Sequence, residues 1–192
     1  MILVIDTSAA MSAWAALLGD HDSTHLFTTF RNNRAITTHL AGMVKGKKLT
    51  AVAVATGPGS FTGLRVGVSF GLGLAMGLRI PIIPLPSLDL QAARAHVPAI
   101  AVMEAGRGRV YYQLPGGKPM LGDPADIPSS HPLVGNVALK TEAALVDAGH
   151  RFIPAQELKD HSEAAKGMLE GAREVPYGSL KIEYMQSFSA RN

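Results

Sequence analysis

The chain has 192 residues, of which 47% are apolar and 17% are charged. This composition allows a large buried core and excludes an intrinsically disordered chain. No cysteine is present, which excludes disulfides, thiolate metal sites and cysteine nucleophiles. The net charge of +3 is too small for the dense basic footprint of an autonomous nucleic-acid binder.

The location of the protein is indicated by its first residues and by its one long apolar segment. The opening MILVIDTSAA lacks the basic start of a signal peptide. Residues 66–78 are uncharged, but Arg79 and Pro81 follow before the roughly 20 residues that a bilayer requires. We therefore expect a cytoplasmic protein that does not enter a membrane, in line with the lack of cysteine.

The first half of the chain alternates between apolar strands and helices. Short apolar or alternating runs predict strands at residues 2–5, 12–18, 24–30, 51–55 and 80–85. Prolines interrupt the last of these, which places it at the periphery of a sheet. Helical spacing predicts helices at residues 35–44, 62–78 and 88–95. Ser60 or Thr62 can cap the second helix and Ser87 the third.

The pattern then restarts near residue 98. The apolar run 99–103 ends in Glu104, much as the run 2–5 ends in Asp6. Further strands are expected at 110–114 and 133–137 and helices at 141–148 and 162–173, with a proline-rich loop at 115–132. The sequence thus predicts an α/β fold of two related lobes, residues 1–97 and a smaller, less regular lobe at 98–192.

The most informative loop is Gly57-Pro58-Gly59-Ser60-Phe61, between a predicted strand and a predicted helix. A glycine-rich turn in this place can cradle phosphate. A P-loop would need a lysine after Gly63, and Pro58 removes an N–H donor from the turn. Phosphate binding is therefore an alternative that the residues disfavour.

The predicted helix after this loop has a face without side chains, because Gly63, Gly67, Gly71 and Ala75 recur every four residues. Each interior glycine costs about 1 kcal/mol of helix stability, so the face must permit close backbone approach. The neighbour lies either in the same chain or in a second chain. We expect a second chain, with Phe70 and Leu74 as anchors and Arg65 reaching a carboxylate. The expected interface comprises Thr62, Gly63, Arg65, Val66, Gly67, Phe70, Gly71 and Leu74.

The segments MILVIDTS, GPGSFTGLRVG and the glycine-rich helix followed by IP resemble the bacterial TsaB (YeaZ) family of tRNA threonylcarbamoyladenosine biosynthesis proteins. The resemblance is specific over residues 1–8 and 51–88. Residues 104–112 are similar to the family's D-A-R-x-G-x-V-Y stretch, with Glu104 and Gly106 in place of Asp and Arg. The resemblance to this family implies an actin-like, hexokinase-like ATPase (ASKHA) fold of two related lobes, each a mixed β-sheet flanked by helices.

The resemblance also implies a function. It implies a non-catalytic subunit, without a cofactor of its own, that scaffolds the catalytic TsaD and the ATPase TsaE in N6-threonylcarbamoyladenosine (t6A) modification of tRNA. The helix near residues 62–78 would form homodimers or bind TsaD, and tRNA would be contacted only through the complex.

Two catalytic alternatives remain open from the residues. A metallopeptidase-like (glycoprotease) enzyme needs a metal site, but His21 and His25 lie in a polar turn rather than on one helix face. A weak nucleotide-binding protein could use a cleft between the lobes, with Asp6, Thr7 and Glu104 at the ends of two strands. We expect neither a catalytic residue nor a metal site.

Overall fold

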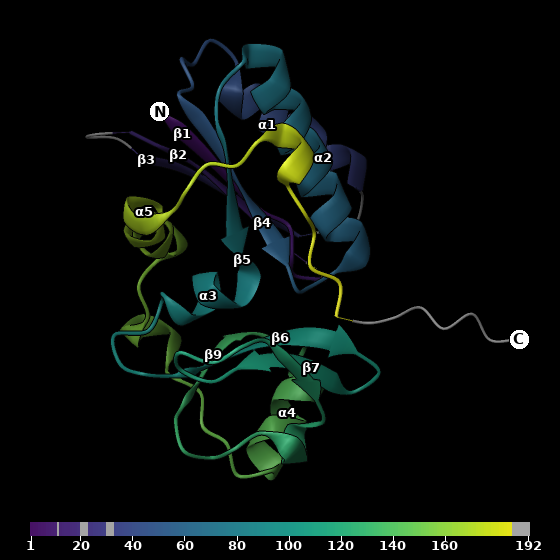
Figure 1. Ribbon diagram of the computed structural model, residues 1–192. Helices are drawn as coiled ribbons and strands as arrows, with labels where there is room; N and C mark the ends of the chain where they lie inside the picture. Colours follow the sequence, from purple (N-terminus) through teal and green to yellow (C-terminus); the bar gives the residue numbers. More distant parts are fainter. Residues whose placement is uncertain (11, 20–22, 30–32, 186–192) are drawn as a thin grey trace, which may run out of the picture.

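The computed structural model describes residues 1–10, 12–19, 23–29 and 33–185. Its first lobe is built on a five-stranded mixed sheet with the strand order β3-β2-β1-β4-β5 (Figure 1). The meander of β1, β2 and β3 is antiparallel, and β4 and β5 run parallel to β1. The strands are β1 (Ile2–Asp6), β2 (Ser12–Leu18), β3 (Ser23–Thr29), β4 (Ala51–Gly57) and β5 (Ile82–Pro86).

The second lobe repeats this topology on a smaller scale. Its sheet has the order β8-β7-β6-β9, again an antiparallel meander followed by a strand, β9, parallel to the first. The prediction of two related α/β lobes is thereby confirmed. The strands are β6 (Ile100–Gly106), β7 (Arg109–Gln113), β8 (Met120–Gly122) and β9 (Leu133–Asn136).

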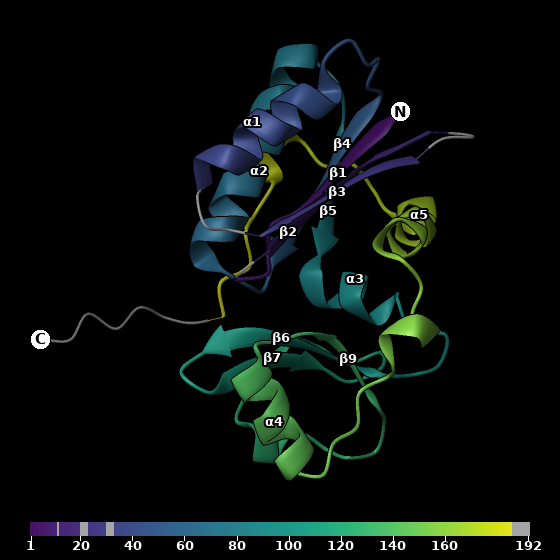
Figure 2. The same cartoon turned by 180° about the vertical axis from the view of Figure 1, so that it is seen from behind.

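Both faces of the first sheet are buried. Leu3 and Ile5 of β1 point to the face covered by α1 (Asn33–Val44) and α2 (Phe61–Leu78). Val4 points to the opposite face, which α5 (His161–Gly171) covers (Figure 2). A strand buried on both sides is apolar at every position, which is why the sequence shows runs of aliphatic residues rather than alternation.

Helix α3 (Ser87–Ala92) lies between the two sheets (Figures 1 and 2). Leu90 packs with the core of the first lobe, and Leu88 packs with that of the second. The outer face of the second sheet is covered by α4 (Leu139–Asp147), which contributes the buried Leu145. Three short 3₁₀ turns complete the fold: Pro124–Asp126, Ala155–Glu157 and Tyr177–Ser179.

Three local expectations need correction. The second lobe does not extend over residues 98–192, because α5 and the residues after it pack back onto the first sheet. Ser87 does not cap α3; it lies inside the helix, and its hydroxyl accepts a 3.0 Å hydrogen bond from the Gly57 N–H. Strand β8 was expected to be loop, because three residues give too short a pattern to identify.

The glycine face of α2 is turned toward the chain's own sheet. A Cβ atom at Gly63 would lie within 3.0 Å of the Thr7 carbonyl oxygen, and one at Gly67 would clash with the Thr7 hydroxyl. A Cβ at Gly71 would collide with Val54 of β4. The expectation that these three glycines face a second chain is therefore wrong. They face β1 and β4 of the same chain, which was the alternative considered.

Alanine at Gly63 should destabilise the fold, whereas alanine at Gly73 should stabilise it. The Gly63→Ala methyl meets a backbone oxygen that cannot turn away, at a cost of about 2 kcal/mol or more. Gly73 lies in the same helix with nothing within 4 Å of its Cβ position, so Gly73→Ala should gain up to about 1 kcal/mol. Urea unfolding curves of both variants measure this, and equal effects at the two positions would contradict the assignment of faces.

A buried ring pair joins α5 to the first sheet. The His161 imidazole stacks on Trp14 with 5.4 Å between the ring centroids. The pKa of His161 is lowered to about 4, by burial above all and also by the nearby Arg94 charge, against the opposing effect of Asp160. The imidazole is therefore neutral in the folded protein at neutral pH.

This neutral histidine should make the fold sensitive to acid. In the unfolded chain His161 takes up its proton near pH 6.5, whereas the folded chain resists protonation down to about pH 4. Its contribution is complete above pH 6.5 and is lost as the pH falls toward 4, by up to about 3 kcal/mol. We expect His161→Phe to flatten the fall in unfolding free energy between pH 7 and 5, followed by the fluorescence of the single Trp14. The same substitution at exposed His96 should leave that fall unchanged.

Candidate docking surface and the cavity between the lobes

The loop Gly57–Phe61 is tied to its surroundings by its own backbone. The Ser60 N–H donates a 2.7 Å hydrogen bond to the Ser8 carbonyl, and a Cβ at Gly59 would run into that same carbonyl. The Ser60 hydroxyl caps α2 by accepting the Gly63 N–H at 3.2 Å, as predicted. The Gly57 N–H is also bonded, to the Ser87 hydroxyl. The N–H groups of this loop therefore stabilise the fold, and the glycines can be explained without a bound phosphate.

The outer face of α2 carries a second row of residues, which we call the seam. Its members follow at alternating spacings of four and three residues, the repeat of a helix that packs along another helix. All are exposed except Val66, which is half-buried, and two of them are small. The seam consists of Thr62, Val66, Ser69, Gly73 and Met76.

Of the expected interface residues, five therefore remain accessible at or beside the seam. Thr62 and Arg65 are exposed, and Val66, Phe70 and Leu74 are half-buried against the core. Arg65 is the only charged residue of the helix. By length and mean hydropathy, 1.4, Phe61–Leu78 could also cross a membrane. Here its glycine face packs on β1 and β4 as a core helix does.

Arg65 is held in place by two aromatic rings at the start of α2. Its guanidinium carbon lies 3.7 Å from the centroid of the Phe61 ring, and its Nε donates a 3.1 Å hydrogen bond to the Tyr184 hydroxyl. The two rings are themselves 5.1 Å apart. A guanidinium stacked in this way is fixed before any partner arrives.

Tyr184 belongs to a segment that the sequence did not reveal, residues 174–185, here called the C-terminal strap. Its apolar side chains Val175, Leu180 and Ile182 pack against the core beneath α2. The Tyr177 hydroxyl lies 2.9 Å from the Ile80 carbonyl oxygen and 3.2 Å from that of Ala75, at the end of α2. The alternation of apolar residues at 180, 182 and 184 was the available signal for an extended segment.

Asp6 and Thr7 do not open toward a cleft. Both are buried: the Asp6 carboxylate accepts hydrogen bonds from the Ser8 N–H and hydroxyl, and Thr7 donates to the Gly63 carbonyl oxygen at 2.7 Å. Burial raises the pKa of Asp6, against the opposing effects of Ser8 and the Arg94 charge. Thr7 thus attaches α2 to β1, and Asp6 holds Ser8 at the end of β1.

Glu104, in contrast, lines a cavity of about 190 Å³ between the lobes. The cavity is formed by the loop before α2, the β6–β7 hairpin and the end of the C-terminal strap. Asp6 and Thr7 do not line it, so the three residues of the expected nucleotide cleft are not brought together.

The remaining candidates do not form a site. His21 lies outside the described residues, and only the backbone of His25 is described, in β3. Ser130 and His131 are linked side chain to side chain at 2.9 Å on the surface. Among the described residues, no group of three His, Asp or Glu side chains could hold a metal ion.

Comparison with known proteins gives several relatives named TsaB. The chain is 33% identical over 129 residues to the tRNA threonylcarbamoyladenosine biosynthesis protein TsaB of Bacillus subtilis (strain 168), covering 60% of this chain and 56% of that protein. The TsaB protein of Haemophilus influenzae is 33% identical over 128 residues, 58% of this chain and 52% of that protein. The chain thus spans a little more than half the length of these curated relatives.

The family described as "TsaD: tRNA N6-adenosine threonylcarbamoyltransferase" matches residues 40–123. Among solved structures, YeaZ from Pseudomonas aeruginosa superposes with a TM-score of 0.73 at 17% identity, covering 96% of this chain and 99% of that one. A second, described as an uncharacterized protein with similarity to peptidase YEAZ from the same organism, has a TM-score of 0.71 at 19% identity and the same coverage. The fold is accordingly of the actin-like ASKHA type. In its motifs, its relatives and its fold, the chain is similar to the bacterial TsaB (YeaZ) family.

Proposed function

We propose that this protein is a non-catalytic partner subunit for t6A modification of tRNA, and that it docks a TsaD-type catalytic subunit on the seam of α2. The relatives named TsaB support the process. The seam supports the role, because it is an exposed helix face that residues 1–10, 12–19, 23–29 and 33–185 leave uncovered.

The observation that carries the proposal is the composition of this face. An 18-residue helix at the surface ordinarily carries charged residues on its outer side, but α2 has only Arg65. Met76 is 52% exposed and Leu78 is 51% exposed. Small residues at the centre of the seam, Ser69 and Gly73, would let a partner helix approach closely, with Met76 as an apolar anchor at one end.

The non-catalytic role is supported by the hydrogen bonds that the polar residues near the ends of β1 and β6 already make within the chain. Asp6 accepts hydrogen bonds from Ser8, and the Thr7 hydroxyl donates a hydrogen bond to the Gly63 carbonyl oxygen. The oxygens of Glu104 accept hydrogen bonds from two backbone N–H groups. We propose that the chain acts by presenting α2 in a fixed position, while the TsaD-type subunit transfers threonylcarbamoyl.

The proposal of a single docking face also determines how the other components of the complex would be arranged. A TsaE-type ATPase would join the pair, and tRNA would be contacted only through the complex. In isolation two copies of this chain would use the same seam to form a homodimer, so that self-association and docking of the TsaD-type subunit exclude each other.

Met76→Asp and Gly73→Trp should each abolish docking. The first buries an unpaired carboxylate in an apolar contact, and the second fills the space that a partner helix needs. We expect at least a tenfold weaker affinity for a purified TsaD-type subunit by calorimetry, and a monomer by light scattering. Threonylcarbamoyl transfer to tRNA by the reconstituted subunits should fall in parallel.

The matched control is Leu139→Asp on α4, which places the same carboxylate on an apolar residue that is 84% exposed in the other lobe. It should leave docking and transfer unchanged. If both seam variants bind within twofold of the original chain while keeping its melting temperature, α2 is not the docking surface.

A further inference from the structure

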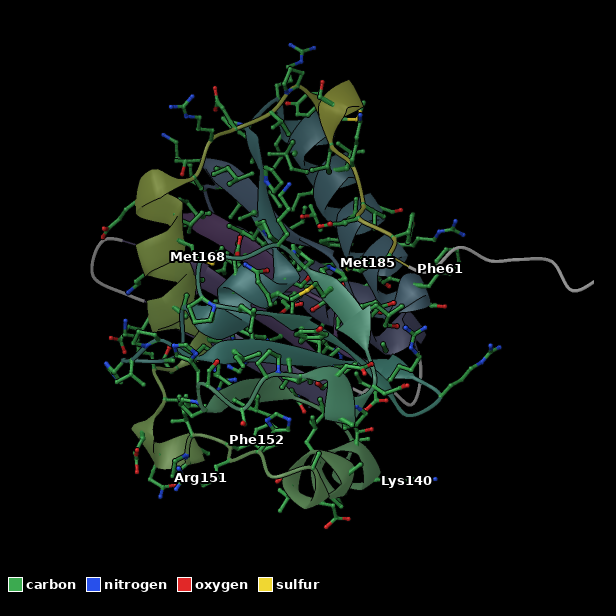
Figure 3. All side chains as sticks on the ribbon, turned by 60° about the horizontal axis from the view of Figure 1, so that its bottom comes forward. Phe61, Lys140, Arg151, Phe152, Met168 and Met185 are labelled. Atoms are coloured by element: carbon green, nitrogen blue, oxygen red, sulfur yellow. The ribbon has the colours of Figure 1, made fainter. Side chains whose placement is uncertain are left out.

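The cavity between the lobes has no role in the docking just described, and its walls come from parts of the chain far apart in sequence. Phe61 enters from the first turn of α2, Glu104 and Tyr111 from the β6–β7 hairpin, and Glu183 and Met185 from the C-terminal strap. Figure 3 shows Phe61 and Met185 on the same side of the molecule, where α2 and the strap approach the second lobe.

Glu104 is a fixed carboxylate that forms no ion pair with the described residues. Oε1 accepts the Gly106 N–H and Oε2 accepts the Ala138 N–H, each at 3.2 Å, which sets the orientation of the group. A carboxylate has about four acceptor positions, so each oxygen can accept once more. No described cation lies within ion-pair distance of Glu104 or of Glu183.

Tyr111 supplies a second, independent indication of a ligand. The residue is only 5% exposed, it lines the cavity, and its hydroxyl forms no hydrogen bond within the described part of the chain. The hydroxyl oxygen itself is not among the buried unpaired atoms of the described residues, so a ligand in the cavity can reach it. Burial raises the pKa of Tyr111, against the effect of Arg109, so the hydroxyl is protonated and can both donate and accept.

The shape and polarity of the cavity together select the ligand. Its charged lining residues are Glu104 and Glu183, and Tyr111, Ser60 and Tyr184 contribute hydroxyl groups, of which the last two already accept hydrogen bonds from the Gly63 N–H and from Arg65. The other walls are apolar or aromatic and include Phe61 and Met185. At about 190 Å³ it is smaller than the roughly 300–1,000 Å³ typical of cofactor sites. Phosphate would meet two carboxylates, whereas an apolar stem with a cationic head would meet complementary groups along its whole length.

None of Arg65, Arg107 and Arg109 lines this space. Arg65 lies over the Phe61 ring and is bonded to Tyr184, and it is not among the residues that line the cavity. Arg109, on the same hairpin, faces Asp123 and the Leu121 carbonyl oxygen.

We propose that this cavity is a receptor for a single cationic head group, a guanidinium or a primary ammonium on an apolar stem, with Glu104 as its ion-pair partner and Tyr111 as an additional hydrogen-bond partner. The head group belongs either to an arginine or lysine side chain of another polypeptide or to a free small amine. The inference does not rest on docking at α2.

The test uses the full chain without any partner. Nα-acetyl-arginine N-methylamide, the uncharged citrulline counterpart and n-butylguanidine are titrated by NMR, with Kd values for the two cations expected in the millimolar range. The cations should bind at least tenfold more tightly than the citrulline compound, because the uncharged compound cannot form the charge-assisted hydrogen bond with Glu104. Tighter binding of the capped arginine would identify a polypeptide side chain as the source, and tighter binding of n-butylguanidine a free small molecule.

Variants separate the ion pair from the shape of the cavity. Glu104→Gln should weaken cation binding about tenfold or more, and Tyr111→Phe by about two- to fivefold. Glu142→Gln removes an exposed carboxylate on α4 and serves as the matched control. Should Glu104→Gln disturb the hairpin, Glu183→Gln together with Tyr111→Phe provides the same test without touching a backbone contact of Glu104.

Three results would overturn the proposal. One is no shift with either cation up to about 20 mM, and another is equal binding of the citrulline compound. The third is a combined Glu183→Gln and Tyr111→Phe variant that binds within twofold of the original chain. None of these results bears on the affinity of α2 for a TsaD-type subunit, so the two proposals can fail separately.

Discussion

The contact between Thr7 and Gly63 determines how the first lobe is assembled. The Thr7 hydroxyl donates a 2.7 Å hydrogen bond to the Gly63 carbonyl oxygen, and the Thr7 carbonyl lies where a side chain at position 63 would begin. Such an approach of helix to strand is possible only without a Cβ atom. Gly67 and Gly71 continue it over the next two turns. The end of β1, the loop before α2 and the helix therefore form one unit.

The same contact explains why α2 depends on its neighbours. A helix with so many glycines is weak in isolation, at about 1 kcal/mol for each, and must be supported by packing. The sheet supports it from beneath and the C-terminal strap from the side. Only the outer face of α2 remains exposed, and Arg65 is the one charged residue of the helix. An apolar surface of this kind does not prevent the chain from folding alone, but burying it against a partner would be favourable.

The sequence predicted the elements well and their neighbours less well. Aliphatic runs identify buried strands, and Ser60 identifies the start of α2, because these depend on local chemistry. A four-residue repeat shows that Gly63, Gly67 and Gly71 share a face, but it cannot say what lies opposite; Gly73 belongs to the other face of the same helix. Asp6 and Glu104 lie near the ends of equivalent strands, and each accepts the N–H of the residue two positions on. Asp6 also accepts the Ser8 hydroxyl and is buried, whereas Glu104 lines a cavity, a difference that the apolar runs before them do not reveal.

The strap has a mechanical consequence for the two lobes. They are already joined through α3, and the strap adds a second connection: Tyr177 holds it at one end of α2, Tyr184 at the other, and Met185 reaches the core of the second lobe. Two ties in parallel share any load. A rotation of one lobe against the other would therefore act on the contacts that Tyr177 and Tyr184 make at the two ends of α2.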